Sequence, residues 1–86
     1  MGSYTIRFDR KVKKDFRSIL AQDIKRIKSA IQDLSNNPRP NGCTKLKGSN
    51  DYYRIRVGSY RIVYSIEDKT LLILMIKVGH RRDIYR

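Results

Sequence analysis

Two alternating segments on either side of a two-residue turn constrain this chain most. Residues 52–57 and 60–66 alternate along much of their length between apolar and polar side chains, as strands with one buried and one open face do. Gly58-Ser59 separates them, and a glycine first in a two-residue connection is typical of a type II′ hairpin turn. The sequence therefore predicts an antiparallel hairpin in the second half of the chain.

Arginines occupy alternate positions on this predicted hairpin. Ile55 and Ile62 are expected to point toward a core, because strand side chains alternate between the two faces of a sheet. Arg54, Arg56 and Arg61 would then share the opposite, open face. The sequence therefore predicts a group of guanidinium side chains on the open face.

The first half of the chain predicts a short strand at residues 4–8 and two helices. Asp9 precedes the first helix and offers a side-chain cap. We expect a break between the helices near residues 21–23, and an end to the second helix before Pro38. The apolar stripes are Val12, Phe16, Ile19 and Leu20 in the first helix and Ile24, Ile27, Ile31 and Leu34 in the second.

Residues 70–78 predict the last strand, after a turn at residues 67–69. Its six consecutive apolar residues, 71–76, are typical of an interior strand. We expect its open face to present Leu71, Ile73, Met75 and Lys77. The fold class is α+β with the order β-α-α-β-β-β, in which a helical hairpin packs on one face of a small, mostly antiparallel twisted sheet, and residues 1–86 form a single domain.

The charge of the chain favours a polyanionic partner. Twenty Lys and Arg residues stand against eight Asp and Glu, a formal net charge of +12. The alternative is a basic domain without an anionic partner. No apolar run approaches the roughly 20 residues that span a bilayer, and no secretory signal pattern opens the chain. No membrane partner is expected, because the basic residues are spread over helices and strands and are not gathered in one amphipathic segment.

The single cysteine and single histidine limit metal and redox chemistry. Cys43 has no second cysteine to pair with, and a free thiol fits a reducing cytoplasm. His80 is the only histidine. No cluster of histidine, cysteine and carboxylate side chains predicts a metal site, and no small-molecule cofactor is expected.

Several segments together resemble the RelE/ParE superfamily of bacterial toxins, and the RelE-like messenger-RNA interferases in particular. They are Phe8-Asp9 with the helical hairpin, residues 45–48, 53–56 and 58–64, and the tail Val78-Gly79-His80-Arg81-Arg82-Asp83-Ile84-Tyr85. The resemblance implies metal-independent cleavage of mRNA in the ribosomal A site by attack of the ribose 2′-OH. It also implies contacts with 16S ribosomal RNA and a RelB-like antitoxin protein as partner. The apolar stretch from Leu71 to Met75 is a candidate docking surface for that antitoxin.

The resemblance also implies roles for individual residues. Arg61 and Arg81 match arginines that stabilise charge at the scissile phosphate, and Tyr85 matches a tyrosine that activates or orients the 2′-OH. Arg54 and Arg56 fall where family members carry two catalytic lysines.

Arginine does not give up its proton in proteins, so these two residues cannot serve as a lysine base would. His80 therefore becomes a candidate for acid–base work. Lys45, Lys47 and Arg82 are expected to bind the RNA backbone.

Each assignment has a structural alternative. Arg61 could be a solvated strand charge, His80 a loop residue with an ordinary hydrogen bond, and Tyr85 a ring packed on the sheet edge. Arg54 and Arg56 could bind phosphate without taking part in catalysis. The alternative functions are a ParE-like toxin that poisons DNA gyrase and a basic RNA- or ribosome-binding module without activity.

Overall fold

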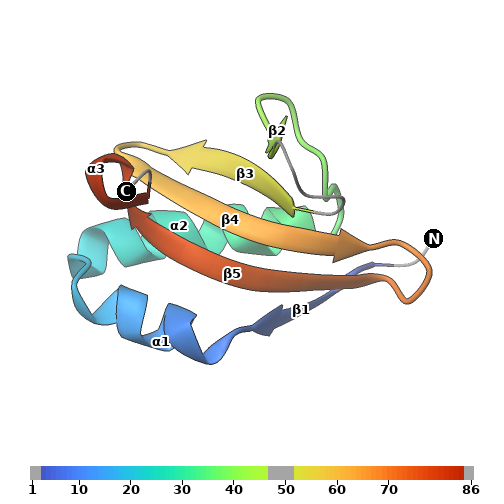
Figure 1. The fold of residues 1–86 in the computed structure, drawn as a ribbon, viewed down its shortest axis with the longest axis horizontal. Helices are drawn as coiled ribbons and strands as arrows, with labels where there is room; N and C mark the ends of the chain where they lie inside the picture. The colour runs from blue at the N-terminus through green and yellow to red at the C-terminus, as the bar shows by residue number, and fades with distance from the viewer. Residues whose placement is uncertain (1–2, 47–51, 85–86) are drawn as a thin grey trace.

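A computed structural model describes residues 3–46 and 52–84, and it shows two helices on one side of a sheet (Figure 1). The predicted α+β class and the predicted order of the main elements are confirmed. A two-residue edge strand, β2, and a short terminal helix, α3, are added to that order. The elements are β1 (Thr5–Phe8), α1 (Arg10–Arg17), α2 (Ala21–Leu34), β2 (Thr44–Lys45), β3 (Tyr52–Val57), β4 (Tyr60–Glu67), β5 (Leu72–His80) and α3 (Arg81–Ile84).

The five strands form one mixed sheet in the order β1-β5-β4-β3-β2. β1 pairs with β5 in parallel, and the other neighbours are antiparallel. β5 therefore lies inside the sheet, as its apolar sequence predicts. None of the helices in the described part of the chain is long and apolar enough to cross a membrane.

The core lies between the two long helices and the sheet. Tyr64 is fully buried there, and its hydroxyl donates a hydrogen bond to the Pro38 carbonyl oxygen at 2.7 Å. Cys43 is a free thiol, partly buried against the same core. The buried apolar residues are Val12, Ile19, Ile27, Ile31, Leu34, Ile55, Ile62, Tyr64, Ile66, Ile73, Met75 and Val78.

The helix boundaries confirm one predicted cap and correct one junction. The Asp9 carboxylate accepts a hydrogen bond from the Lys11 backbone N–H at 3.0 Å, and α2 ends before Pro38 as predicted. α1, however, ends at Arg17, because the Ser18 side chain and backbone N–H both bond back to the Asp15 carbonyl oxygen. Leu20 then adopts an extended conformation before α2 and is 64% exposed, so its predicted place on the buried stripe was wrong.

The predicted faces of the last strand were wrong, and so were its limits. β5 starts at Leu72 and continues to His80, two residues later at each end than predicted. Ile73 and Met75 are fully buried in the core, so neither belongs to the open face. Their neighbours Leu72 and Leu74 are half-buried on that face.

A β-bulge explains why Lys77 nevertheless lies on the predicted face. Tyr64 of β4 pairs with Met75, but Val63 pairs with Lys77, so Ile76 is an extra residue in β5. One extra residue exchanges the two faces of the strand beyond it. Val78 therefore points into the core, and Lys77 lies on the open face with Val63.

Candidate nucleic-acid interface

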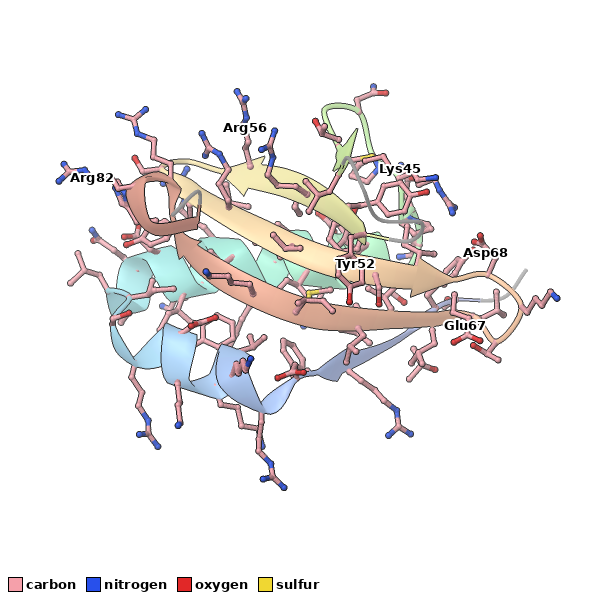
Figure 2. All side chains as sticks on the ribbon, viewed as in Figure 1. Lys45, Tyr52, Arg56, Glu67, Asp68 and Arg82 are labelled. Carbon is pink, nitrogen blue, oxygen red and sulfur yellow. The ribbon has the colours of Figure 1, made fainter. Side chains whose placement is uncertain are left out.

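Three predicted site arginines share the open face of the sheet. Arg56 of β3 pairs directly with Arg61 of β4, and the next pair along the hairpin, Ile55 and Ile62, is buried on the other face. Arg54 lies two residues before Arg56 and therefore faces the same way. Figure 2 shows the Arg56 side chain pointing away from the helices. The shared face predicted from alternation is confirmed.

Arg61 is buried, which argues against the solvated-charge alternative. Its side chain is only 8% exposed, whereas Arg56 is exposed. One terminal nitrogen, Nη1, donates to the carbonyl oxygens of Tyr60 at 3.0 Å and Gly58 at 3.3 Å. Among the described residues its Nε–H is buried without a hydrogen-bond partner. A buried guanidinium with an unpartnered donor costs stability, so its presence favours a functional role.

The β3–β4 turn also holds the start of α3. Val57 pairs with Tyr60, and Gly58 between them has a φ of +59°, which fits the type II′ turn that the sequence predicts. The Ser59 carbonyl oxygen accepts a hydrogen bond from the Arg81 backbone N–H at 2.8 Å. The turn carbonyls therefore accept hydrogen bonds from the Arg61 side chain and from the Arg81 backbone. Both arginines thus lie near the same end of the sheet.

His80 lies on the helix-facing side of the sheet. It pairs with Tyr60, the two rings meet edge to face with centroids 5.7 Å apart, and both residues line a cleft with residues of α2. Arg61 pairs instead with Gly79, one residue earlier, which lies on the open face. The His80 Nδ1 accepts the Arg82 backbone N–H at 3.2 Å, while the exposed Arg82 side chain points outward from α3 (Figure 2). The structure therefore separates the His80 ring from the Arg54, Arg56 and Arg61 face.

The remaining predicted RNA-binding and catalytic residues are Lys45, Lys47 and Tyr85, of which the structure describes Lys45. Lys45 is exposed on the edge strand β2, where it pairs with Tyr53, and its neighbour Thr44 pairs with Arg54. Lys45 is thus beside the arginine face without belonging to it. Lys47 and Tyr85 lie outside the described residues, so their roles stay predictions.

Two charged side chains of α2 were not predicted as site residues. Asp23 and Arg26 line the cleft beside His80, whereas the sequence pattern alone indicates that charged residues on a helix face lie in solvent. Their three-residue spacing places both on one side of α2, and this spacing is the only feature of the sequence that indicates that they lie together. Among residues 3–46 and 52–82, whose side chains the structure describes, no group of three or more metal-ligating side chains occurs.

The family model for the ParE toxin of type II toxin–antitoxin systems matches residues 6–85. The chain belongs to this family, and so to the RelE/ParE superfamily of toxins. Within that class the chain is similar to several RelE proteins.

Toxin RelE3 of Methanocaldococcus jannaschii is 38% identical, over 84% of this chain and 84% of its own length. The mRNA interferase toxin RelE of Escherichia coli is 30% identical, over 92% of this chain and 84% of its own. The toxin in the archaeal RelE–RelB complex from Pyrococcus horikoshii superposes with a TM-score of 0.83 at 28% identity, covering 94% of this chain and 98% of that one. The protein is therefore a RelE-like toxin of the type II class.

Proposed function

We propose that this RelE-like toxin is an endoribonuclease that cleaves messenger RNA in the A site of cytoplasmic ribosomes. The reaction is attack of a ribose 2′-OH on the adjacent phosphate, without a metal ion. The observation that carries the proposal is the buried Arg61 guanidinium, held at the same turn that binds the start of the Arg81 helix. The similarity to an E. coli protein named as an mRNA interferase supports it.

Cleavage by internal attack requires positive charge around the phosphorane that forms. Arg61 and Arg81 supply this charge in the proposal, because a guanidinium stays protonated and can bind two phosphate oxygens at once. Preorganised donors of this kind typically contribute about 10²–10³-fold in rate each. Arg54 and Arg56 bind the flanking phosphates from the open face.

The other predicted residues have supporting roles in the proposal. Tyr85 orients the 2′-OH, and Lys45, Lys47 and Arg82 bind the RNA backbone and neighbouring 16S ribosomal RNA. Because the His80 ring lies on the helix side and its Nδ1 holds the Arg82 N–H, we assign His80 to positioning α3 rather than to proton transfer.

The test is cleavage of a defined message on translating ribosomes, with the new 5′ ends mapped. The wild-type protein is expected to cut within the A-site codon. Replacement of Arg61 and Arg81 together by alanine is expected to reduce the rate by at least about 10³-fold, since two charge-stabilising donors are lost. Arg17→Ala, an exposed arginine of α1, is the matched control and retains activity.

A second variant separates catalysis from folding. Arg61→Met replaces the buried guanidinium with an apolar side chain of similar length. The free energy of unfolding of this variant is therefore expected to equal or exceed that of the wild type. Denaturant titration measures this. Full cleavage by the double alanine variant, or no A-site cleavage by the folded wild type, contradicts the proposal.

We also propose a RelB-like antitoxin as partner. The similar Pyrococcus toxin was solved in complex with RelB, and a chain of charge +12 favours an acidic partner. Of the predicted docking stretch, Ile73 and Met75 are buried in the core, which leaves Leu71, Leu72 and Leu74 for contact. The product of an adjacent reading frame should bind the purified toxin and suppress cleavage; failure of both contradicts this partner.

A gyrase-poisoning toxin is the second candidate, because the matching family model is named for ParE of parDE. It predicts inhibition of gyrase supercoiling without any RNA product. A non-catalytic RNA-binding module predicts neither activity. It predicts only RNA binding whose affinity falls steeply with salt.

A further inference from the structure

A cleft with its own set of charges lies on the helix side of the sheet. It has a volume of about 330 Å³ and opens between α2 and the β3–β4 turn. Asp23 and Arg26 come from α2, Gly58 and Tyr60 from the turn, and His80 from the end of β5. The cleft is thus distinct from the open face, where Arg54 and Arg56 lie, but shares the turn that holds the Arg61 side chain.

The Arg26 guanidinium is available in this cleft. Its Nη2 lies 3.4 Å from the position that a Cβ on Gly58 would occupy, so it rests against the backbone of the turn. With the side chains that the structure describes, in residues 3–46 and 52–82, it forms no hydrogen bond or ion pair, even with Asp23 three residues earlier. A guanidinium with free donors presents a planar fork for two neighbouring acceptors.

The Asp23 carboxylate faces the same space. It lines the cleft together with Tyr60. Partial burial and the nearby Asp23 charge raise the pKa of Tyr60. The Tyr60 ring, packed edge to face on His80, adds an aromatic surface. The cleft therefore offers paired donors, paired acceptors and a flat apolar wall.

These donors and acceptors disfavour small anionic ligands and suit the base guanine. A bare phosphate or carboxylate would meet repulsion from Asp23. Guanine carries two adjacent acceptors, O6 and N7, which suit a bidentate arginine, and two adjacent donors, N1–H and the 2-amino group, which suit a carboxylate. Unstacked bases of single-stranded RNA are commonly read on these edges and stacked on aromatic side chains.

We propose that the cleft between α2 and the β3–β4 turn binds an unpaired guanine base of RNA, with Arg26 on O6 and N7 and Asp23 on N1–H and the 2-amino group. The inference rests on the proposed RNA substrate. Binding of the base alone, however, does not depend on cleavage. A guanine held here would anchor the RNA at the far side of the turn that positions Arg61.

The test is a nuclear magnetic resonance titration of the labelled protein with nucleosides, which lack the phosphate that would bind the open face. Guanosine is expected to shift the backbone amides of Asp23, Gly58 and Tyr60. Inosine lacks the 2-amino group and 7-deazaguanosine lacks N7, so each should bind about tenfold more weakly or worse, as expected for one lost hydrogen bond to a charged group. Adenosine should bind most weakly. Equal binding of all four nucleosides, or shifts confined to other residues, overturns the proposal.

Variants assign the contacts to the two side chains. Asp23→Asn should abolish the preference for guanosine over inosine, and Arg26→Gln the preference over 7-deazaguanosine. Asp33→Asn and Arg17→Gln remove matching charges elsewhere on the helices and should keep both preferences. Guanosine binding without any A-site cleavage would refute the nuclease proposal alone. Cleavage without guanosine binding would refute the guanine cleft alone.

Discussion

At the scale of single residues, Gly79 and His80 are adjacent in β5 but lie on opposite faces of the sheet. Gly79 pairs with Arg61 on the open face, and His80 pairs with Tyr60 on the helix side. Adjacent strand residues point to opposite faces, so His80 cannot join the arginine group while β5 keeps this register. Its Nδ1 accepts the Arg82 backbone N–H, which supports the proposed role of holding the start of α3.

Substitution of His80 separates positioning from proton transfer. The asparagine Oδ1 can accept the Arg82 N–H in place of Nδ1, so His80→Asn is expected to lower the cleavage rate by less than about tenfold, whereas His80→Ala loses the acceptor and more activity. Loss of a general acid or base would cost about 10²–10⁴-fold in either variant. The measurement is the cleavage rate as a function of pH. An equal, large loss in both variants, with the loss of a titration between pH 5 and 8, would identify His80 as an acid or base instead.

At the scale of elements, the sequence predicted the arginine face well because β3 and β4 alternate and a two-residue turn fixes their register. It could not predict the faces of β5, since a run of six apolar residues contains no alternation and the bulge at Ile76 leaves no mark in composition. The burial of Arg61 and the cleft beside Arg26 could not be predicted from the sequence either, because both depend on how elements distant in the sequence pack together.

The bulge is held from outside the sheet by α1. Beyond the last β1–β5 pair, Phe8 with Met75, the Val78 backbone N–H donates to the Asp15 carboxylate at 3.1 Å. A backbone donor at this edge would otherwise lose its partner. Asp15 therefore fixes the part of β5 that leads to Gly79 and α3.

Asp15→Ala is expected to lower the free energy of unfolding by about 1.5–3 kcal/mol, the usual contribution of a hydrogen bond to a charged group. Asp15→Asn keeps an acceptor and should lose less. Denaturant titration gives the stabilities, and hydrogen exchange should show the Val78 amide losing protection more than that of Ile62. If both amides lose protection equally, Asp15 acts on the whole fold and does not hold the bulge.

At the scale of the whole molecule, one polar network joins segments that are far apart in the sequence. The Arg39 guanidinium binds both carboxylate oxygens of Asp68, at 2.9 and 3.2 Å, and the Tyr4 hydroxyl donates to Asp68 at 2.7 Å. Arg39 also donates to the Tyr53 hydroxyl at 3.2 Å. The network thus ties the chain before β1, the segment after α2, strand β3 and the β4–β5 turn to one another.

Because this network is ionic, its contribution to stability depends on pH at both ends of the scale. The hydrogen bonds from Arg39 and Tyr4 lower the pKa of Asp68 below its usual 3.8, so the stabilisation is complete above 3.8 and is lost as the pH falls through the lower folded value. The bond to Asp68 raises the pKa of Tyr4 above its usual 10.0, so its share is complete below 10.0 and is lost as the pH rises through the higher folded value. Asp68→Asn should therefore be less stable than the wild type near neutral pH, with the difference shrinking toward both extremes.

The measurement is the free energy of unfolding of the wild type and Asp68→Asn, from denaturant titrations across that range. The difference between the two proteins isolates the network, because protonation of the other carboxylates destabilises both chains alike. Glu67→Gln, an exposed neighbour outside the network, controls for the loss of one negative charge from a chain of charge +12 and should change stability little. Both side chains of the ion pair are about half exposed, so added salt should reduce the wild-type advantage as well. A difference that stays constant from acid to alkaline pH would mean that Asp68 stabilises the turn through its shape alone, and that these segments are joined by packing instead of charge.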